Sequence, residues 1–204
     1  VRVGYVGECN PRVECRIADN GEVLVKSPGQ MLGYYKNPEK TAEDMTEDGF
    51  LKTGDRGEID EQGRLQITGR VKDLFKTGKG KYVAPAPIED KLGGHEAVEA
   101  CVVTGANLGQ PLGIVMLNLE AVAGAQSAEG RKALEQSLTQ HLAKVNATLD
   151  PHEQLQCIVV STTPWTVEND IITPTFKVKR NRIEDLYAAK FNEWEESRKK
   201  VLWA

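Results

Sequence analysis

The sequence has 204 residues, of which 40% are hydrophobic and 27% are charged, as is ordinary for a globular protein. Its formal net charge of −4 argues against general nucleic-acid binding, because that function requires a basic surface. No run of about 18 apolar residues is present, so the sequence predicts no transmembrane segment.

Short strands and glycine-containing turns dominate the first 70 residues. Val13–Ile17 alternates apolar and polar residues, Glu22–Val25 indicates a second strand, and an Asp-Asn-Gly turn separates them, which predicts a hairpin. Glu58–Asp60 and Arg64–Gly69 predict a second hairpin. Asn37–Thr41 predicts the start of a short helix, with proline in its first turn. This part of the chain therefore indicates a small antiparallel unit.

After Arg70 the sequence interleaves strands and helices. The predicted elements are a hairpin of 73–76 and 81–83 with the loop 77–80 at its tip, a helix at 85–92, strands at 98–103, 112–117 and 155–160, a helix at 127–149, and a closing amphipathic helix at 183–203. The fold class is therefore predicted as α/β (α+β). A β-rich unit at 1–70 precedes a compact mixed-sheet domain with flanking helices at 71–204.

The four cysteines are scattered and lack the CxxC spacing that would favour zinc. Cys101 and Cys157 lie in apolar runs, which predicts buried free thiols in a reducing compartment. No signal peptide is apparent, so we expect a cytoplasmic protein, either in solution or associated with a membrane surface. The chain begins with Val1 rather than Met, and we expect a piece of a longer or processed protein.

One basic stretch stands out between Gly69 and Tyr82, where four lysines, an arginine and three glycines occur. Glycines allow a backbone to approach a ligand closely, and lysines supply positive charge for phosphate. The Thr77–Lys81 loop lacks the spacing of a Walker A loop. A flexible, solubilising hairpin tip is the alternative.

Two single residues carry a chemical hypothesis. The Asp55 carboxylate follows a Thr-Gly turn and could accept two hydrogen bonds from a vicinal diol; the alternative is an aspartate that bonds its own turn. Lys177, in the segment TPTFKVKR (173–180), could stabilise a developing negative charge. Its alternative is a basic segment that opens the last helix. The three histidines are dispersed, so neither a catalytic triad nor a metal site is predicted.

These motifs, taken in order, closely resemble the adenylate-forming (AMP-binding) superfamily, which includes acyl-CoA synthetases, peptide-synthetase adenylation domains and luciferases. The resemblance extends from about Gly4 to Arg180, and its strongest segments are GYYKNPEKT (33–41), GFLKTGD (49–55), GRLQITGRVKD (63–73) and Ile88–Glu89. It implies the C-terminal portion of such an enzyme. Residues 1–70 would end the large N-terminal domain, and residues 71–204 would form the small mobile domain.

The resemblance also implies roles for individual residues. Asp55 would bind the ribose hydroxyls of ATP with help from Arg70, and Lys72 would be the hinge, where many relatives have Asp and long-chain synthetases also use Lys. Gly80 would lie beside the pantetheine of CoA during thioester formation, and Lys177 would reach ATP and the carboxylate during adenylation. ATP, Mg²⁺ and CoA would be required, with the Mg²⁺ ligands and the acyl pocket in the missing N-terminal domain.

Some features depart from the family pattern or leave alternatives open. The 76–83 loop is one residue longer than in short-chain synthetases, and an arginine expected near Lys81 or Tyr82 is absent, so no phosphate contact is assigned there. The form of the Lys177 segment looks more like that of long-chain fatty acyl-CoA synthetases, which favours a long-chain or bulky carboxylate. An adenylation domain that loads a carrier-protein thiol and a non-catalytic binding module derived from the small domain remain as rivals.

Overall fold

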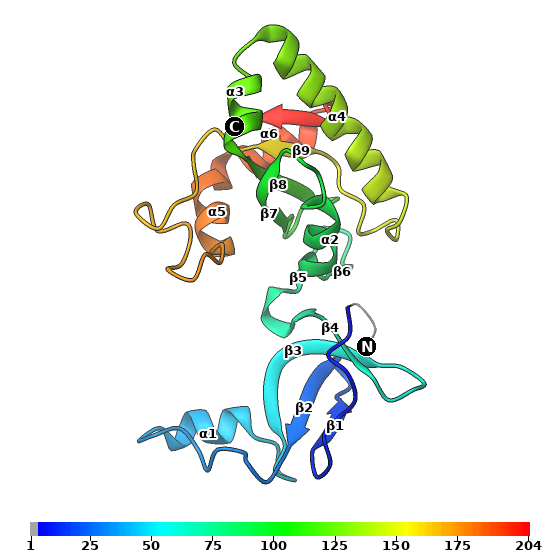
Figure 1. Ribbon diagram of the computed structural model, residues 1–204, viewed down its shortest axis with the longest axis vertical. Helices are drawn as coiled ribbons and strands as arrows, with labels where there is room; N and C mark the ends of the chain where they lie inside the picture. The colour runs from blue at the N-terminus through cyan, green and yellow to red at the C-terminus, as the bar shows by residue number, and fades with distance from the viewer. Residues whose placement is uncertain (1–3) are drawn as a thin grey trace. The chain divides into compact units, whose positions relative to one another are not determined.

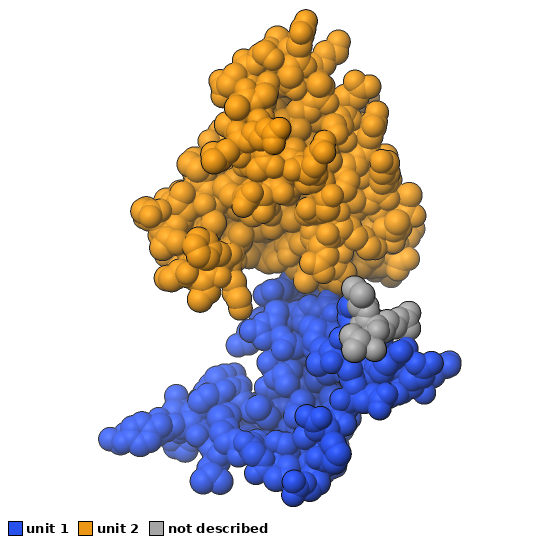
Figure 2. Space-filling model, viewed as in Figure 1, with its two compact units in different colours: residues 1–74 blue, residues 75–204 orange. Residues whose placement is uncertain are grey.

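A computed structural model describes residues 4–204, which form two compact units, 1–74 and 75–204 (Figures 1 and 2). Each unit is described by itself below. The boundary predicted from the sequence lies at 70/71. Both units mix strands with helices, so the predicted α/β (α+β) class is confirmed.

The first unit is built on a four-stranded antiparallel sheet. Its strands are β1 (Glu14–Ile17), β2 (Glu22–Lys26), β3 (Leu51–Ile59) and β4 (Leu65–Arg70), paired in that order. Helix α1 (Pro38–Asp44) begins after Asn37, whose side chain accepts a hydrogen bond from the backbone N–H of Lys40 at 3.0 Å. Both predicted hairpins and the helix are therefore confirmed.

The second unit contains a mixed sheet in the order β10-β9-β8-β7 and a separate two-stranded hairpin. β7 pairs antiparallel with β8, whereas β8, β9 and β10 are parallel. The elements are β5 (Phe75–Lys76), β6 (Tyr82–Val83), α2 (Pro85–Leu92), β7 (Val98–Thr104), β8 (Leu112–Leu117), α3 (Leu119–Gly124), α4 (Ala128–Asn146), β9 (Ile158–Val160), α5 (Arg180–Tyr187), α6 (Phe191–Glu196) and β10 (Val201–Trp203), with 3₁₀ turns η1 (Val71–Asp73) and η2 (Ala188–Lys190).

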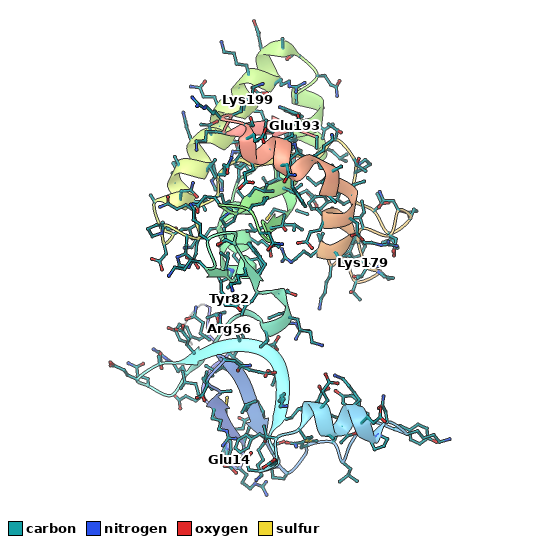
Figure 3. The ribbon with its side chains drawn as sticks, turned by 180° about the vertical axis from the view of Figure 1, so that it is seen from behind. Glu14, Arg56, Tyr82, Lys179, Glu193 and Lys199 are labelled. Atoms are coloured by element: carbon teal, nitrogen blue, oxygen red, sulfur yellow. The ribbon has the colours of Figure 1, made fainter. Side chains whose placement is uncertain are left out.

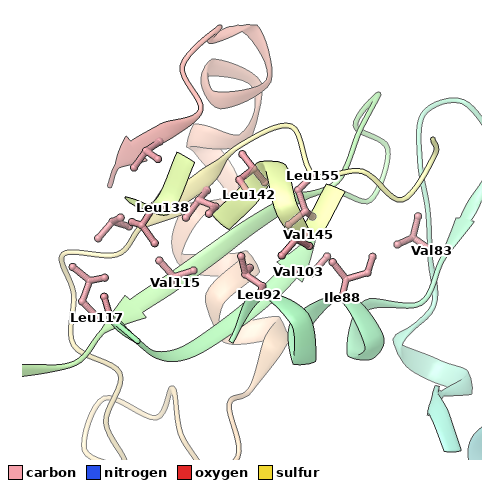
Figure 4. Packing of buried hydrophobic residues seen from close by; sticks show 14 residues of the cluster. Val83, Ile88, Leu92, Val103, Val115, Leu117, Leu138, Leu142, Val145 and Leu155 are labelled. Atoms are coloured by element: carbon pink, nitrogen blue, oxygen red, sulfur yellow. The ribbon is translucent and has the colours of Figure 1, made fainter. Parts of the chain in front are cut away.

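Both faces of this sheet are buried, because successive side chains of a strand point to opposite faces. Val103 and Val115 pack with Leu138 and Leu142 of α4 and with α2 (Figure 4). The neighbouring residues Val102 and Ile114 pack instead with Ile183, Tyr187, Trp165 and Trp194 on the other face. The two helix layers thus hold the sheet from both sides, which makes a rigid platform for the loops that leave its strands.

The closing helix predicted at 183–203 is wrong in its second half. The helical stretch starts at Arg180 and ends at Glu196, after which Val201–Trp203 form strand β10. β10 pairs with β9, more than forty residues earlier in the sequence, and local periodicity does not report such a pairing. Trp203 therefore lies on a strand rather than on the helix. The predicted strand at 155–160 is shorter and starts at Ile158.

The four cysteines should differ in reactivity, because they differ in exposure. Burial raises the pKa of Cys157 to about 11 and that of Cys101 to about 12, and burial together with neighbouring Cys9 raises the pKa of Cys15 to about 11. Cys9 is exposed. Because the thiolate is the reactive form, we expect one fast-reacting thiol in the native protein at about pH 8 and four after denaturation. Thiol–disulfide titration measures this, and two or more fast thiols would contradict the packing described here.

Candidate functional site

In the first unit the structure brings Asp55 and Arg70 together. The two residues are cross-strand partners on β3 and β4, and the Arg70 guanidinium donates to the Asp55 carboxylate at 2.6 Å. Both side chains remain partly exposed, at 34% for Asp55 and 59% for Arg70. An ion pair this exposed contributes less than about 1 kcal/mol to stability.

The Thr-Gly turn before Asp55 is held by other groups. Thr53 donates its hydroxyl to the Val23 carbonyl at 2.8 Å and accepts from the backbone N–H of Asp55 at 3.1 Å. Gly54 has a φ of +74°, and its N–H donates to Glu22. The hydrogen bond that the structure gives to the Asp55 carboxylate comes from Arg70 rather than from its own turn, which was the alternative interpretation, and the side chain is partly exposed.

Lys72 lies in η1, a single 3₁₀ turn between β4 and β5 that buries none of its residues. Such turns are common connectors and hinges. The side chain is exposed and lines a pocket of about 550 Å³ with Arg70 and Asp44. Hydrogen bonding from Lys40 is the main reason why the pKa of Asp44 is low, and the positive charge of Lys72 lowers it further. The backbone around Lys72 is thus outside any long helix or strand, as a hinge requires.

The hairpin β5–β6 carries Gly80 in the second unit. Gly80 has a φ of +78°, a conformation that favours glycine, and its N–H donates to the Thr77 carbonyl at 2.9 Å. Lys79 and Lys81 are exposed beside it, and Tyr82 is exposed on β6 (Figure 3). The hairpin therefore exposes a glycine turn and positive charge, but no arginine.

Gly78 is a further important residue of this hairpin that the sequence analysis did not separate from Gly80. Its N–H donates to the Leu108 carbonyl at 2.7 Å, and Asn107 donates back to the Lys76 carbonyl at 2.9 Å. A Cβ atom at Gly78 would lie 2.7 Å from the Asn107 carbonyl oxygen. The signal in the sequence was the pair of glycines, Gly78 and Gly80. In the structure Gly80 forms the turn, whereas Gly78 packs against the backbone of residues 107–108.

Substituting Gly78 with alanine should push the hairpin away from the 107–108 backbone. We expect the free energy of unfolding of this unit to fall by about 1–3 kcal/mol, as for other overpacked sites. Chemical denaturation measures it. The matched control is Gly124→Ala in the same unit, where a Cβ meets nothing within 4 Å and no destabilisation is expected. Equal stability of the two variants would show that the hairpin does not depend on this close approach.

Lys177 is exposed on a tight loop before α5. Its backbone N–H donates to the Thr173 hydroxyl at 3.0 Å, its carbonyl accepts from the Thr173 N–H at 2.8 Å, and Ile172 bridges to Val178. Phe176 forms the turn with a φ of +60°. The loop is therefore ordered by its own hydrogen bonds, although it carries an exposed cation.

The neighbouring cations are engaged differently from Lys177. Lys179 (labelled in Figure 3) and Arg182 both bind the Asp170 carboxylate, and hydrogen bonding from Lys179 is the main reason why the pKa of Asp170 is lowered. Lys177 forms none of the ion pairs found within residues 4–204. Its ammonium group is thus exposed and outside the ion pairs found in the part of the chain that the structure describes.

Arg180 fastens the loop to the sheet and to α2. It pairs with Glu89 at 2.8 Å and donates to the Val103 carbonyl, and Glu89 accepts from the Val103 N–H at 2.7 Å. The side chains of Arg180 and Glu89 are only 21% and 19% exposed. Both residues stood in the motifs noted in the sequence, but nothing in the sequence indicated that they pair.

Among residues 4–204 no cluster of three or more His, Cys, Asp or Glu side chains is arranged to hold a metal ion. In the same range, no helix combines the length and apolar character needed to cross a bilayer.

Known proteins are similar to this chain in sequence and in structure. The family described as AMP-binding enzyme C-terminal domain matches residues 72–198. A long-chain fatty acid–CoA ligase of Mycobacterium tuberculosis is 33% identical over 201 residues, covering 93% of this chain and 33% of the relative. A peroxisomal long-chain acyl-CoA synthetase of Arabidopsis thaliana is 30% identical and is covered over 30% of its length. The chain thus spans about a third of these curated relatives.

Two solved structures extend the comparison. The adenylation domain of a carboxylate reductase from Mycobacterium chelonae superimposes with a TM-score of 0.76 at 26% identity, covering 91% of this chain and 31% of that one. ATP-bound MatB from Rhodopseudomonas palustris superimposes with a TM-score of 0.68, also at 26% identity, covering 92% of this chain and 36% of that one.

Proposed function

This chain belongs to the AMP-binding enzyme C-terminal domain family, and from that premise we propose that it is the C-terminal part of an acyl-CoA synthetase. The complete enzyme would convert a fatty acid, most fittingly a long-chain one, and ATP into an acyl-adenylate and pyrophosphate. The thiol of CoA would then displace AMP. The observation that carries the proposal is the exposed Lys177 ammonium on an ordered loop, in a chain whose curated relatives are named long-chain ligases.

In the first half-reaction a carboxylate oxygen attacks the α-phosphorus of ATP, and negative charge builds on the phosphate oxygens. An ammonium group held on a rigid loop stabilises that charge without reorganising, and this kind of effect is worth several kcal/mol. Lys177 would fill this role, while Asp55 accepts hydrogen bonds from the ribose hydroxyls and Arg70 holds the Asp55 carboxylate in position. ATP-bound MatB supports nucleotide binding in this family.

In the second half-reaction the pantetheine of CoA would approach the Gly80 hairpin. A glycine backbone allows close approach, and Lys79 and Lys81 supply positive charge for the phosphates of CoA. Mg²⁺ would act with ATP, and we propose that its ligands belong to the preceding domain. The expected cytoplasmic location also remains a proposal, and some curated relatives are named peroxisomal.

The hinge proposal leads to a prediction at Lys72. Proline at 72 fixes its own φ and disfavours the helical conformation of Val71, which belongs to the 3₁₀ turn. We expect Lys72→Pro in the complete enzyme to hold one orientation and to damage one half-reaction by at least about tenfold more than the other, as gating steps do. Lys72→Ala is the control, since it removes the charge but keeps the backbone free. Equal damage to both half-reactions would argue against a hinge.

The proposed acyl-CoA synthetase and an adenylation domain that loads a carrier protein differ in the thiol that accepts the acyl group. A carboxylate reductase from Segniliparus rugosus, solved as an adenylation domain joined to its carrier domain, is also structurally similar, which keeps a carrier-protein acceptor in view. The complete enzyme should be supplied with ATP, a fatty acid and either CoA or a phosphopantetheinylated carrier protein. Acyl-CoA formation supports the proposal, acylation of the carrier alone supports the rival, and the absence of acyl-adenylate would support a non-catalytic module.

A further inference from the structure

A groove of about 840 Å³ lies between helix α4 and strand β10, and none of the residues assigned above lines it. Its walls come from the first half of α4, from α6 and from the last residues of the chain. Lys199 and Glu193, labelled in Figure 3, belong to it. We propose that this groove binds an extended acidic peptide segment, which pairs with the open edge of β10.

The lining of the groove carries more positive than negative side chains. Arg131, Lys132, Lys199 and Lys200 line the groove and are exposed. The groove also contains two carboxylates: Glu193 is exposed, whereas Glu135 accepts from the Trp203 indole N–H at 2.7 Å and pairs with Arg131 at 3.4 Å. Four cations and two carboxylates leave the groove with a net charge of +2. The whole chain has a net charge of −4, so the groove differs in sign from the rest of the molecule. Complementary charge would recruit a negatively charged partner.

The groove borders the edge of the sheet that β10 forms. β10 is the end strand, and it pairs only with β9 in the sheet order. The Ile158 N–H donates to the Lys200 carbonyl, and the Ala204 N–H donates to the Val160 carbonyl. The backbone groups of the even-numbered residues from 200 to 204 therefore point toward β9. Alternation along the strand therefore turns the backbone groups of Val201 and Trp203 toward the open side. All three residues of β10 line the groove, so a second strand laid there would meet these groups.

The geometry favours a peptide over a bilayer or a nucleic acid. The groove is concave, whereas a membrane surface is flat on this scale. The Arg131 guanidinium lies 4.2 Å from the centre of the Trp203 ring, and the indole N–H is held by Glu135. The ring is therefore part of the groove wall, where it neither anchors in lipid nor offers a free face for stacking bases.

The test uses the 204-residue protein and a fluorescent peptide of alternating glutamate and valine, with a lysine–valine peptide for comparison. Fluorescence anisotropy should show saturable binding of the acidic peptide only, and binding should weaken as salt is raised. Amide hydrogen exchange at Val201 and Trp203 should slow when the peptide is bound. The double variant Lys132→Glu/Lys199→Glu should weaken binding by at least about tenfold, because it reverses two charges of the groove.

The matched control is Lys144→Glu/Lys190→Glu, which changes the net charge equally. Lys144 is exposed on the same helix and Lys190 on η2, and neither lines the groove. Equal weakening by both double variants would overturn the proposal, because it would reduce the effect to overall charge. Binding that leaves exchange at Val201 and Trp203 unchanged would also overturn it, as would binding to phosphatidylserine vesicles without binding to the peptide.

Discussion

Replacing Lys177 with alanine in the complete enzyme is expected to slow acyl-adenylate formation by about 10²–10³-fold, the usual effect of removing one preorganised charge-stabilising donor. The reason is that Lys177 presents an exposed ammonium group on a loop that Thr173 and Arg180 hold in place. Fatty-acid-dependent exchange of pyrophosphate into ATP measures this half-reaction. Transfer of a supplied acyl-adenylate to CoA should change by no more than a few-fold, because we propose that Lys177 acts in the first step only.

Lys190→Ala is the matched control for Lys177→Ala, because Lys190 is also an exposed lysine of the second unit. It should leave both half-reactions near their original rates. If Lys177→Ala slowed adenylation and thioester formation by the same factor, the assignment of Lys177 to one step would fail.

Replacing Arg180 with methionine should have the second largest effect. It removes the ion pair with the mostly buried Glu89 carboxylate, and it releases the Lys177 loop from Val103. Because the two side chains keep some exposure, we expect a loss of about 1–3 kcal/mol in the free energy of unfolding of the second unit, less than for a fully buried pair. Adenylation should also slow, since the loop would lose its anchor.

Two further variants test whether the effect of Arg180→Met comes from its ion pair with Glu89. In the double variant Glu89→Leu/Arg180→Met no charge is left unpaired, so its destabilisation should be smaller than the sum of the single effects. Arg182→Met is the matched control: Arg182 pairs with Asp170 at 49% exposure on both sides, and its loss should cost less than about 1 kcal/mol. Arg180→Met and Arg182→Met with the same stability would show that the Glu89 contact does not hold the loop.

Local sequence patterns predicted the antiparallel unit and most of the second sheet, because the signals involved are short-range. The Asn-Gly turn after Asp19, the asparagine cap of α1 and the Ser127 cap of α4 each lie within a few residues of the element that they define. The short helix α3 was missed, although Asn118 caps it, because six residues give little periodicity. β10 was assigned to a helix because β9, its partner among the described residues, is distant in the sequence.

The candidate site was predicted in a different way. Asp55 and Lys177 were singled out from the residues themselves, a family resemblance gave them their roles and added Arg70, Lys72 and Gly80, and all of these roles remain predictions. The structure adds contacts that no spacing rule provides. The ion pair of Glu89 with Arg180 joins residues 91 positions apart, and Gly78 docks on a loop some thirty residues later. Such long-range polar contacts depend on how strands assemble, so a single sequence does not reveal them.

We propose that one mobile unit presents Lys177 and then Gly80 to a single bound nucleotide. Distance measurement between spin labels in the complete enzyme tests it most directly, with Glu61→Cys and Lys190→Cys as exposed labelling positions and Cys9→Ser to remove the exposed thiol. We predict one distance distribution with ATP and a non-reactive fatty-acid analogue, and a clearly different one with AMP and CoA. A single unchanged distribution under both conditions would contradict the account.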